Sequence, residues 1–198
     1  MWTRIALSAG LIAGLSAPAL SAVTYDFTGK GGLFDGETSV DVPLTDSVTG
    51  LSTTMTVEAS GGTLNSNSGD FGVNAPGSGD TTDVIEDGEA IDLTFDSDIE
   101  LNSIDFGGIG SDLADGATLT IGTFTIDLFT NVSGFNGNTD VYTPATPIAI
   151  TAGTPINLQV ASSTADFDLE TIDISVVPEP GSVALLGLGG LLMLRRRA

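Results

Sequence analysis

Carboxylate side chains supply most of the potential chemistry in this sequence, and they are densest between residues 80 and 100. Hard oxygen ligands in a glycine-rich loop are typical of Ca²⁺ sites, which take about six to eight oxygens, including backbone carbonyls. Asp83, Asp87 and Glu89 are therefore a candidate calcium site. Asp26 or Asp173 could join them from neighbouring strands. The alternative is that these acids form a solvated face that keeps the protein soluble.

The spacing of these acids does not match the most recognisable calcium-binding loops. If Asp83 takes the first position of an EF-hand loop, the third and twelfth positions fall on Ile85 and Thr94, which are not carboxylates. Repeated nonapeptide calcium motifs are also missing from the sequence. Calcium is therefore a candidate ligand, and no cofactor is required.

Several catalytic chemistries need residue types that this sequence lacks. Without His or Cys, the chain has no conventional zinc site and no Ser-His or Cys-His nucleophile pair. Paired carboxylates can hydrolyse glycosides across a cleft, but among so many acids some pair will always be suitably spaced. Aromatic residues of the kind that line sugar clefts are scarce, with only Tyr25 and Tyr142 as tyrosines. We therefore expect no enzymatic activity, and a secreted jelly-roll hydrolase is the least favoured alternative.

The charge is strongly negative and unevenly distributed. The chain has 26 Asp and Glu against 5 Lys and Arg, and Lys30 is the only basic residue between Val23 and Val177. A surface of this kind repels phosphate backbones, which excludes nucleic acid as a partner of the body. It also repels itself unless salt screens it or cations bind, which is a second reason to consider calcium.

Residues 1–22 have the order of a secretory signal peptide, with a basic start, an apolar run and small residues at the end. Arg4 precedes the apolar run Ile5–Leu15, which is shorter than the roughly 20 residues that a membrane-spanning helix needs. We expect this segment to form a helix, to enter the Sec export machinery and to be cleaved after Ser21 or Ala22.

Residues 177–198 combine three parts, which are Pro178-Glu179-Pro180, an apolar stretch and the cluster Arg195, Arg196 and Arg197. The prolines can neither extend a strand ladder nor continue a helix. As a helix at about 1.5 Å per residue, the apolar stretch would reach only about 18 Å, short of a hydrocarbon core near 30 Å. The arginines would hold the extreme C-terminus on the cytoplasmic side of the membrane. A plain single-pass tail anchor is the alternative.

This three-part tail resembles the PEP-CTERM sorting signal of Gram-negative bacteria. The resemblance implies recognition at Pro178-Glu179-Pro180 by an exosortase, a membrane-embedded cysteine transpeptidase-like protease. Cleavage there would pass the body to the cell surface or extracellular matrix, so the chain would meet the membrane only transiently, through its C-terminal helix. Proteins with this signal commonly accompany exopolysaccharide production and biofilm formation, which makes exopolysaccharide an implied partner.

Between these ends, residues 23–176 alternate apolar and polar side chains as half-buried strands do, with turn-forming residues between the alternating segments. No segment of the body carries an apolar stripe at helical spacing over three turns. The sets expected to share a buried face are Ile91, Leu93 and Phe95; Phe124, Ile126 and Leu128; and Ile156, Leu158 and Val160.

Two of the expected strands change phase part-way along. Ile99 and Leu101 share a face, whereas Ile104 and Phe106 have the opposite phase, and residues 167–176 repeat this pattern. One extra residue in a strand is a β-bulge, and strands that cross between two sheets need such bends. We therefore predict an all-β body, an antiparallel two-sheet sandwich of jelly-roll type, flanked by the N-terminal signal helix and the C-terminal hydrophobic sorting helix.

The stretch from Gly69 to Gly110 also resembles part of an uncharacterised β-sandwich found in exported proteins with this tail, in which the residue matching Glu89 opens a strand. That resemblance assigns no activity. We therefore expect an exported cell-surface or extracellular-matrix protein with a structural or adhesive role linked to exopolysaccharide. The main alternative is a calcium-dependent carbohydrate-binding module.

Overall fold

The computed structural model describes residues 21–67, 69–75, 84–107, 117–128, 140–160 and 166–179, and their regular structure is almost entirely β-strand. The prediction of an all-β protein is therefore confirmed. A short helix, α1 (Gly31–Phe34), follows the first strand. The strands in chain order are β1 (Ala22–Asp26), β2 (Ser39–Thr45), β3 (Ser52–Ser60), β4 (Thr63–Ser66), β5 (Phe71–Asn74), β6 (Ala90–Phe95), β7 (Ile99–Gly107), β8 (Ala117–Ile121), β9 (Phe124–Asp127), β10 (Asp140–Tyr142), β11 (Ile148–Ile150), β12 (Ile156–Val160) and β13 (Asp168–Val176).

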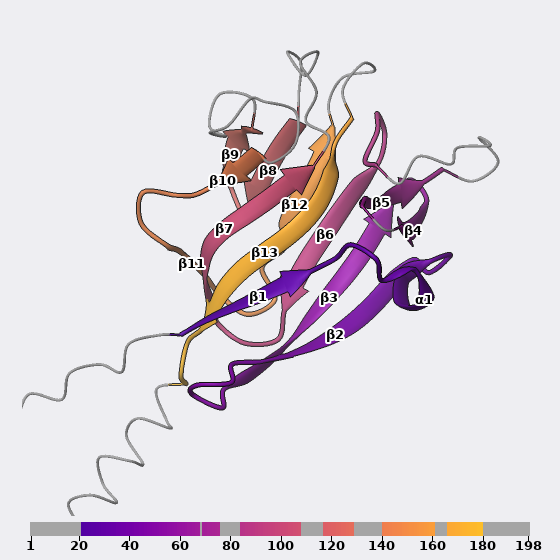
Figure 1. Cartoon of the computed structure of the whole chain (residues 1–198). Coiled ribbons are helices and arrows are strands. Elements are labelled where there is room, and N and C mark those ends of the chain that lie inside the picture. Colours follow the sequence, from indigo (N-terminus) through magenta and orange to yellow (C-terminus); the bar gives the residue numbers. More distant parts are fainter. Residues whose placement is uncertain are drawn as a thin grey trace, which may run out of the picture.

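The strands form two large sheets and a small one, and every pairing between these described strands is antiparallel. Sheet A has the order β1-β13-β7, and β10 and β11 both pair with the other side of β7. Sheet B has the order β2-β3-β6-β12-β8-β9, and sheet C is the ribbon β4-β5. Figure 1 shows sheets A and B stacked as two layers, which is the predicted sandwich.

The core lies between the two layers and is built from the alternation that the sequence shows. Ile91, Leu93 and Phe95 of β6 are buried, whereas Asp92 and Thr94 between them are partly exposed. The same alternation buries the apolar residues of β12 and β8. Since each large sheet has one apolar face, stacking the two sheets removes both faces from water at once.

One residue assigned to the buried faces is misplaced by the sequence prediction. Phe124 is 58% exposed, whereas Ile126 and Leu128 of the same set are buried as expected. Phe124 is the first residue of β9, which pairs with β8 at the edge of sheet B, and it follows a turn at Gly122 with φ +59°. At the end of an edge strand, a side chain can take the core-facing side of its sheet and still lie beyond the area that the opposite sheet covers.

The two predicted phase changes are β-bulges between β13 and β7. Leu169 pairs with Phe106 and Thr171 with Asp105, so Glu170 is the extra residue in β13. Further along, Asp173 pairs with Ser103 and Ile174 with Leu101, so the extra residue lies in β7. The first bulge places an additional acidic residue on β13, which matters for the site described below.

Sheet C and α1 form a second layer of packing around three aromatic rings. Phe27, Phe34 and Phe71 are fully buried, and their ring centroids lie 4.7–6.2 Å apart. Val73 of β5 donates its N–H to the carbonyl of Val84 at 3.0 Å, and Ile85 forms an isolated bridge with Phe167. The segment 84–85 therefore connects sheet C to the start of β13.

The first and last described strands meet at one end of the sandwich. Ala22 at the start of β1 pairs with Ser175 near the end of β13. Figure 1 shows that β1 begins and β13 ends at the same pole of the molecule. Among the described residues, no helix is long and apolar enough to cross a membrane. The predicted signal and sorting helices lie almost entirely outside the described residues.

The contact between sheet C and Val84 gives a direct test of this packing. A Cβ at Gly72 would lie 2.3–2.5 Å from Val84 backbone atoms, so Gly72→Ala forces the two backbones apart. We expect Gly72→Ala to lower the free energy of unfolding by about 2 to 3 kcal/mol in urea denaturation. Gly32→Ala is the matched control, because a Cβ at that position would have nothing within 4 Å, and it should change stability by less than about 0.5 kcal/mol. Equal effects of the two substitutions would contradict this packing.

Candidate functional site

The hydrogen-bonded sandwich stops immediately before the Pro-Glu-Pro element. Strand β13 ends at Val176, and the N–H of Val177 donates to the carbonyl of Asp98 at 3.0 Å. Pro178 has no N–H to donate, and Glu179 is exposed. Glu179 is therefore presented at the surface, two residues after the backbone hydrogen bond of Val177. Pro180 and Arg195, Arg196 and Arg197 lie outside the described residues.

A shallow hollow of about 360 Å³ lies beside this exit point. It is formed by the end of β13 and by the turn that precedes β3, with Glu179 at its side. The residues that line it are Gly50, Leu51, Ser52, Ser97, Val176, Val177 and Glu179. Because the last residues before the element rest against a folded turn, the body fixes where the tail leaves it.

The predicted signal-cleavage position lies at the same pole. Ala22 opens β1, and the Ser21 side chain hydrogen-bonds Asp46 of the turn after β2. Asp46 accepts a hydrogen bond from the Thr49 hydroxyl and another from the Val48 N–H at 2.7 Å. These bonds, the one from Thr49 first, hold the pKa of the Asp46 carboxyl below its usual value. Both predicted processing positions therefore adjoin the β2–β3 hairpin.

The tail is also the part of the chain that comparison with known proteins recognises. Residues 176–198 match a family model described as the PEP-CTERM protein-sorting motif. This chain carries a PEP-CTERM sorting signal. The signal implies export, recognition by an exosortase and targeting to the cell envelope or surface. No curated protein and no solved structure matches the chain.

Of the three predicted calcium residues, the structure describes two. Asp83 lies outside the described residues, Asp87 is exposed, and Glu89 is buried with its Oε2 accepting the Glu86 N–H at 2.9 Å. That hydrogen bond closes the turn before β6, so Glu89 has a structural role there. Among the described residues, no three His, Cys, Asp or Glu are grouped so that they could hold a metal ion. The calcium set with Asp83 stays a prediction.

The two acids expected to join that set lie on the outer face of sheet A. Asp173 accepts hydrogen bonds from the Thr24 hydroxyl at 2.9 Å and from the Asn102 amide at 2.7 Å. Asp26 pairs in register with Thr171, and its Oδ1 accepts bonds from the N–H and hydroxyl of Thr28. Both carboxylates are therefore already engaged in hydrogen bonds.

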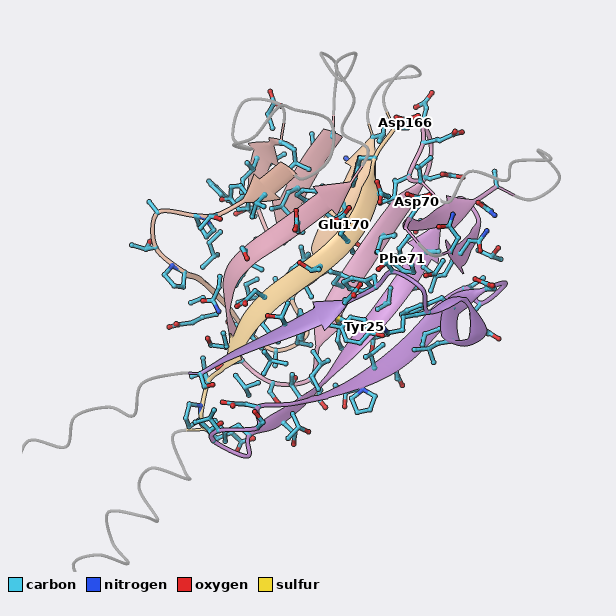
Figure 2. The ribbon with its side chains drawn as sticks, viewed as in Figure 1. Tyr25, Asp70, Phe71, Asp166 and Glu170 are labelled. Atoms are coloured by element: carbon cyan, nitrogen blue, oxygen red, sulfur yellow. The ribbon has the colours of Figure 1, made fainter. Side chains whose placement is uncertain are left out.

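A second group of acids, which the sequence reasoning did not assemble, lies on this outer face near the start of β13. We call it the acidic pole. Figure 2 shows Asp70, Asp166 and Glu170 toward the end of the sandwich opposite to that where β1 begins and β13 ends. The members come from β1, β7, β13 and the segments before β5 and β13, and they are Asp26, Asp70, Asp105, Asp166, Asp168 and Glu170.

Asp168 is the most constrained member of the acidic pole. It is 1% exposed, and its Oδ2 accepts no hydrogen bond from any group in the described part of the chain. Burial, reinforced by the charges of Asp70, Glu170 and Asp166 in that order, raises the pKa of Asp168 to about 7. The pKa of Glu170 is also raised, first by burial and then by the charge of Asp105. Asp168 therefore holds a proton at pH values where ordinary carboxyls have lost theirs.

The sequence alone allows only some of these residues to be grouped. Asp166, Asp168 and Glu170 alternate with Phe167 and Leu169, so their shared face is readable from the sequence. Asp26, Asp70 and Asp105 are distant in sequence, and Asp26 and Asp105 join them only through strand pairing. The alternation predicts that Asp168 points away from the core, but it does not predict that Asp168 is buried.

The raised pKa predicts a stability that falls as pH increases. Because its folded pKa of about 7 lies above the ordinary 3.8, Asp168 keeps a proton that the unfolded chain releases, and folding becomes less favourable as pH rises through this window. In a chelator-containing buffer, Asp168→Asn should raise the free energy of unfolding at pH 8 by about 2 to 4 kcal/mol and change it little near pH 4. Urea denaturation at several pH values measures this difference.

Asp96→Asn is the control of opposite sign. Hydrogen bonds from the Thr54 N–H and the Thr53 hydroxyl, both at 2.8 Å, lower the pKa of Asp96. This substitution should therefore destabilise the protein at pH 8 and do so less in acid. An Asp168→Asn variant that is no more stable than wild type at pH 8 would show that the burial of this carboxyl carries no cost.

Proposed function

We propose that this protein is an exported component of the cell surface or extracellular matrix, processed by an exosortase at Pro178-Glu179-Pro180, with a structural or adhesive role alongside exopolysaccharide. The observation that carries the proposal is the position of the PEP-CTERM signal directly after the last strand of a complete sandwich.

This position allows the tail to be removed without loss of fold. Strand β13 is an interior strand of sheet A, paired with β1 on one side and β7 on the other. Its last residue in the ladder is Val176, which pairs with Ile99. Cleavage at the Pro-Glu-Pro element therefore leaves every described strand pairing intact, which suits a body that functions after the tail is discarded.

The orientation that the molecule would take at a membrane supports the same proposal. Strand β13 runs from the acidic pole to the exit of the tail, and its 9 residues span roughly 30 Å at about 3.3 Å each. While the tail still holds the chain at the membrane, the acidic pole would point away from it. In that orientation the acidic pole is distant from the anionic lipid surface, which repels acidic side chains. The acidic pole then faces the exterior.

A structural or adhesive role accords with the composition of the body. The chain has neither His nor Cys, and its surface is dominated by acidic and hydroxyl side chains on a rigid sheet framework. Such a surface is well hydrated and resists self-association through charge repulsion. Exopolysaccharide is the partner class that the sorting signal's usual setting suggests.

Processing is tested by the mass of the mature chain in a host that contains an exosortase. We expect the wild-type chain to end near Pro178 and to reach the cell surface or medium. The double substitution Pro178→Ala/Glu179→Ala should leave Ala198 in place and hold the chain in the membrane fraction. Glu100→Gln removes one acid elsewhere on the body and should be processed like wild type. An intact Ala198 in the wild-type chain, or normal processing of the double variant, would refute the proposal.

The matrix role needs a separate measurement on the same strains. We expect the processed wild-type protein to co-sediment with exopolysaccharide from the host, and a strain lacking the protein to form weaker biofilm. Normal processing together with free protein in the supernatant and unchanged biofilm would contradict the matrix role while leaving the sorting intact.

A further inference from the structure

The side chains of Asp168 and Glu170 converge over Gly107 on the outer face of sheet A. Gly107 pairs in register with Asp168. A Cβ built on Gly107 would lie 2.5 Å from Asp168 Oδ2, 2.7 Å from Asp168 Oδ1 and 2.7 Å from Glu170 Oε1. Three carboxylate oxygens from two residues therefore lie close to one point beside the Gly107 backbone, which they can approach because glycine has no Cβ.

The convergence follows from the bulge in β13. In a regular strand Asp168 and Glu170 would share a face, with their partners two residues apart on β7. Here Leu169 pairs with Phe106 and the next pair is Thr171 with Asp105, so Glu170 has no partner of its own. A bulge residue is free of the ladder and re-aims its side chain, which here brings its carboxylate toward that of Asp168.

In the part of the chain that the structure describes, neither of these carboxylates forms an ion pair with a basic side chain. Lys30 is the only basic residue between residues 23 and 177, and the nearby acids Asp70, Asp105 and Asp26 add further negative charge. Asp168 is 1% exposed, and its Oδ2 has no hydrogen-bond partner within the described ranges. An unpartnered, buried carboxylate oxygen is costly, and either a proton or a bound cation relieves that cost.

We propose that Asp168 and Glu170 bind a Ca²⁺ ion in the space over Gly107. Oxygen-only ligands favour hard cations, and the chain offers no His or Cys to a softer metal. Two carboxylates supply up to four oxygens, and Ca²⁺ completes its shell with water or backbone carbonyls in an adaptable geometry. Since no three acidic residues in the described segments are grouped around one point, the affinity should resemble that of extracellular modules, with a Kd of about 0.1 to 1 mM.

This site differs from the calcium site predicted around Asp83, Asp87 and Glu89. It lies on sheet A rather than in the loop before β6, and it uses the bulged start of β13. It is also independent of tail processing, because neither Asp168 nor Glu170 belongs to the residues that match the sorting motif.

The test is thermal unfolding of the full chain in mild detergent, after metal removal with a chelator that is then dialysed away. Adding CaCl₂ to about ten times Kd should raise the wild-type Tm by about 3 to 6 °C, relative to NaCl at the same ionic strength. The NaCl comparison is essential, because a net charge of −21 makes any salt stabilise the fold by screening. Calorimetric titration should give one ion per chain.

The variants locate the site. Asp168→Asn and Glu170→Gln should abolish the calcium-specific shift, and both are near-isosteric changes that keep the fold. Glu100→Gln, on the outer face at the far end of β7, should retain the full shift as a matched loss of one acid. The proposal is overturned if wild type responds no more to CaCl₂ than to NaCl, or if Asp168→Asn and Glu170→Gln still respond. Loss of the shift in Asp87→Asn alone would assign calcium to the loop instead and would equally overturn it.

Discussion

The pairing of β13 with both β1 and β7 is the interaction on which the rest of this structure depends. β13 is the last strand of the body in sequence, yet it lies in the middle of sheet A, between the first strand and a strand from the centre of the chain. Sheet A therefore cannot close until the C-terminal part of the body is available. The inward residues Ile172, Ile174 and Val176 then complete the core, and the outward acids are fixed in place at the same time.

This arrangement makes one strand connect two chemically different ends of the molecule. At its C-terminal end, β13 delivers the sorting element to the surface beside the β2–β3 hairpin. At its N-terminal end it carries Asp168 and Glu170 and lies beside Asp105 of β7. Because a strand is extended and its two neighbours fix its course, these ends are kept apart. The polarity of the molecule is thus a property of one element rather than of separate domains.

The bulge at Glu170 decides what each face of that element does. Without it, the period of two would send Ile172 and Ile174 to the face opposite Phe167 and Leu169, and part of the core would face water. The extra residue, Glu170, corrects the phase and becomes an acidic side chain outside the regular ladder. The same local irregularity therefore keeps the core continuous and brings two carboxylates together over Gly107. Core packing and the chemistry of the outer face cannot be altered independently at this point.

Much of this fold is readable from the sequence because it depends on local alternation. The buried set on β6, the phase changes in residues 99–106 and 167–176, and the three-part tail all follow from residues close together in the chain. Phe124 was misassigned because alternation reports which face a side chain takes, and not whether the opposite layer reaches that far.

The acidic pole was missed for a related reason. Its members Asp26, Asp105 and Asp168 are brought together by pairing between strands that are remote in sequence, and no spacing rule encodes that. A dense group of acids, such as that between residues 80 and 100, suggests a binding site, yet in an acidic protein such a group is usually a solvated surface. What distinguishes Asp168 is the near-complete burial of the whole residue together with an oxygen that has no described partner, and both depend on three-dimensional neighbours. In a chain this acidic, a functional carboxylate is therefore better identified by what surrounds it than by how many others lie nearby.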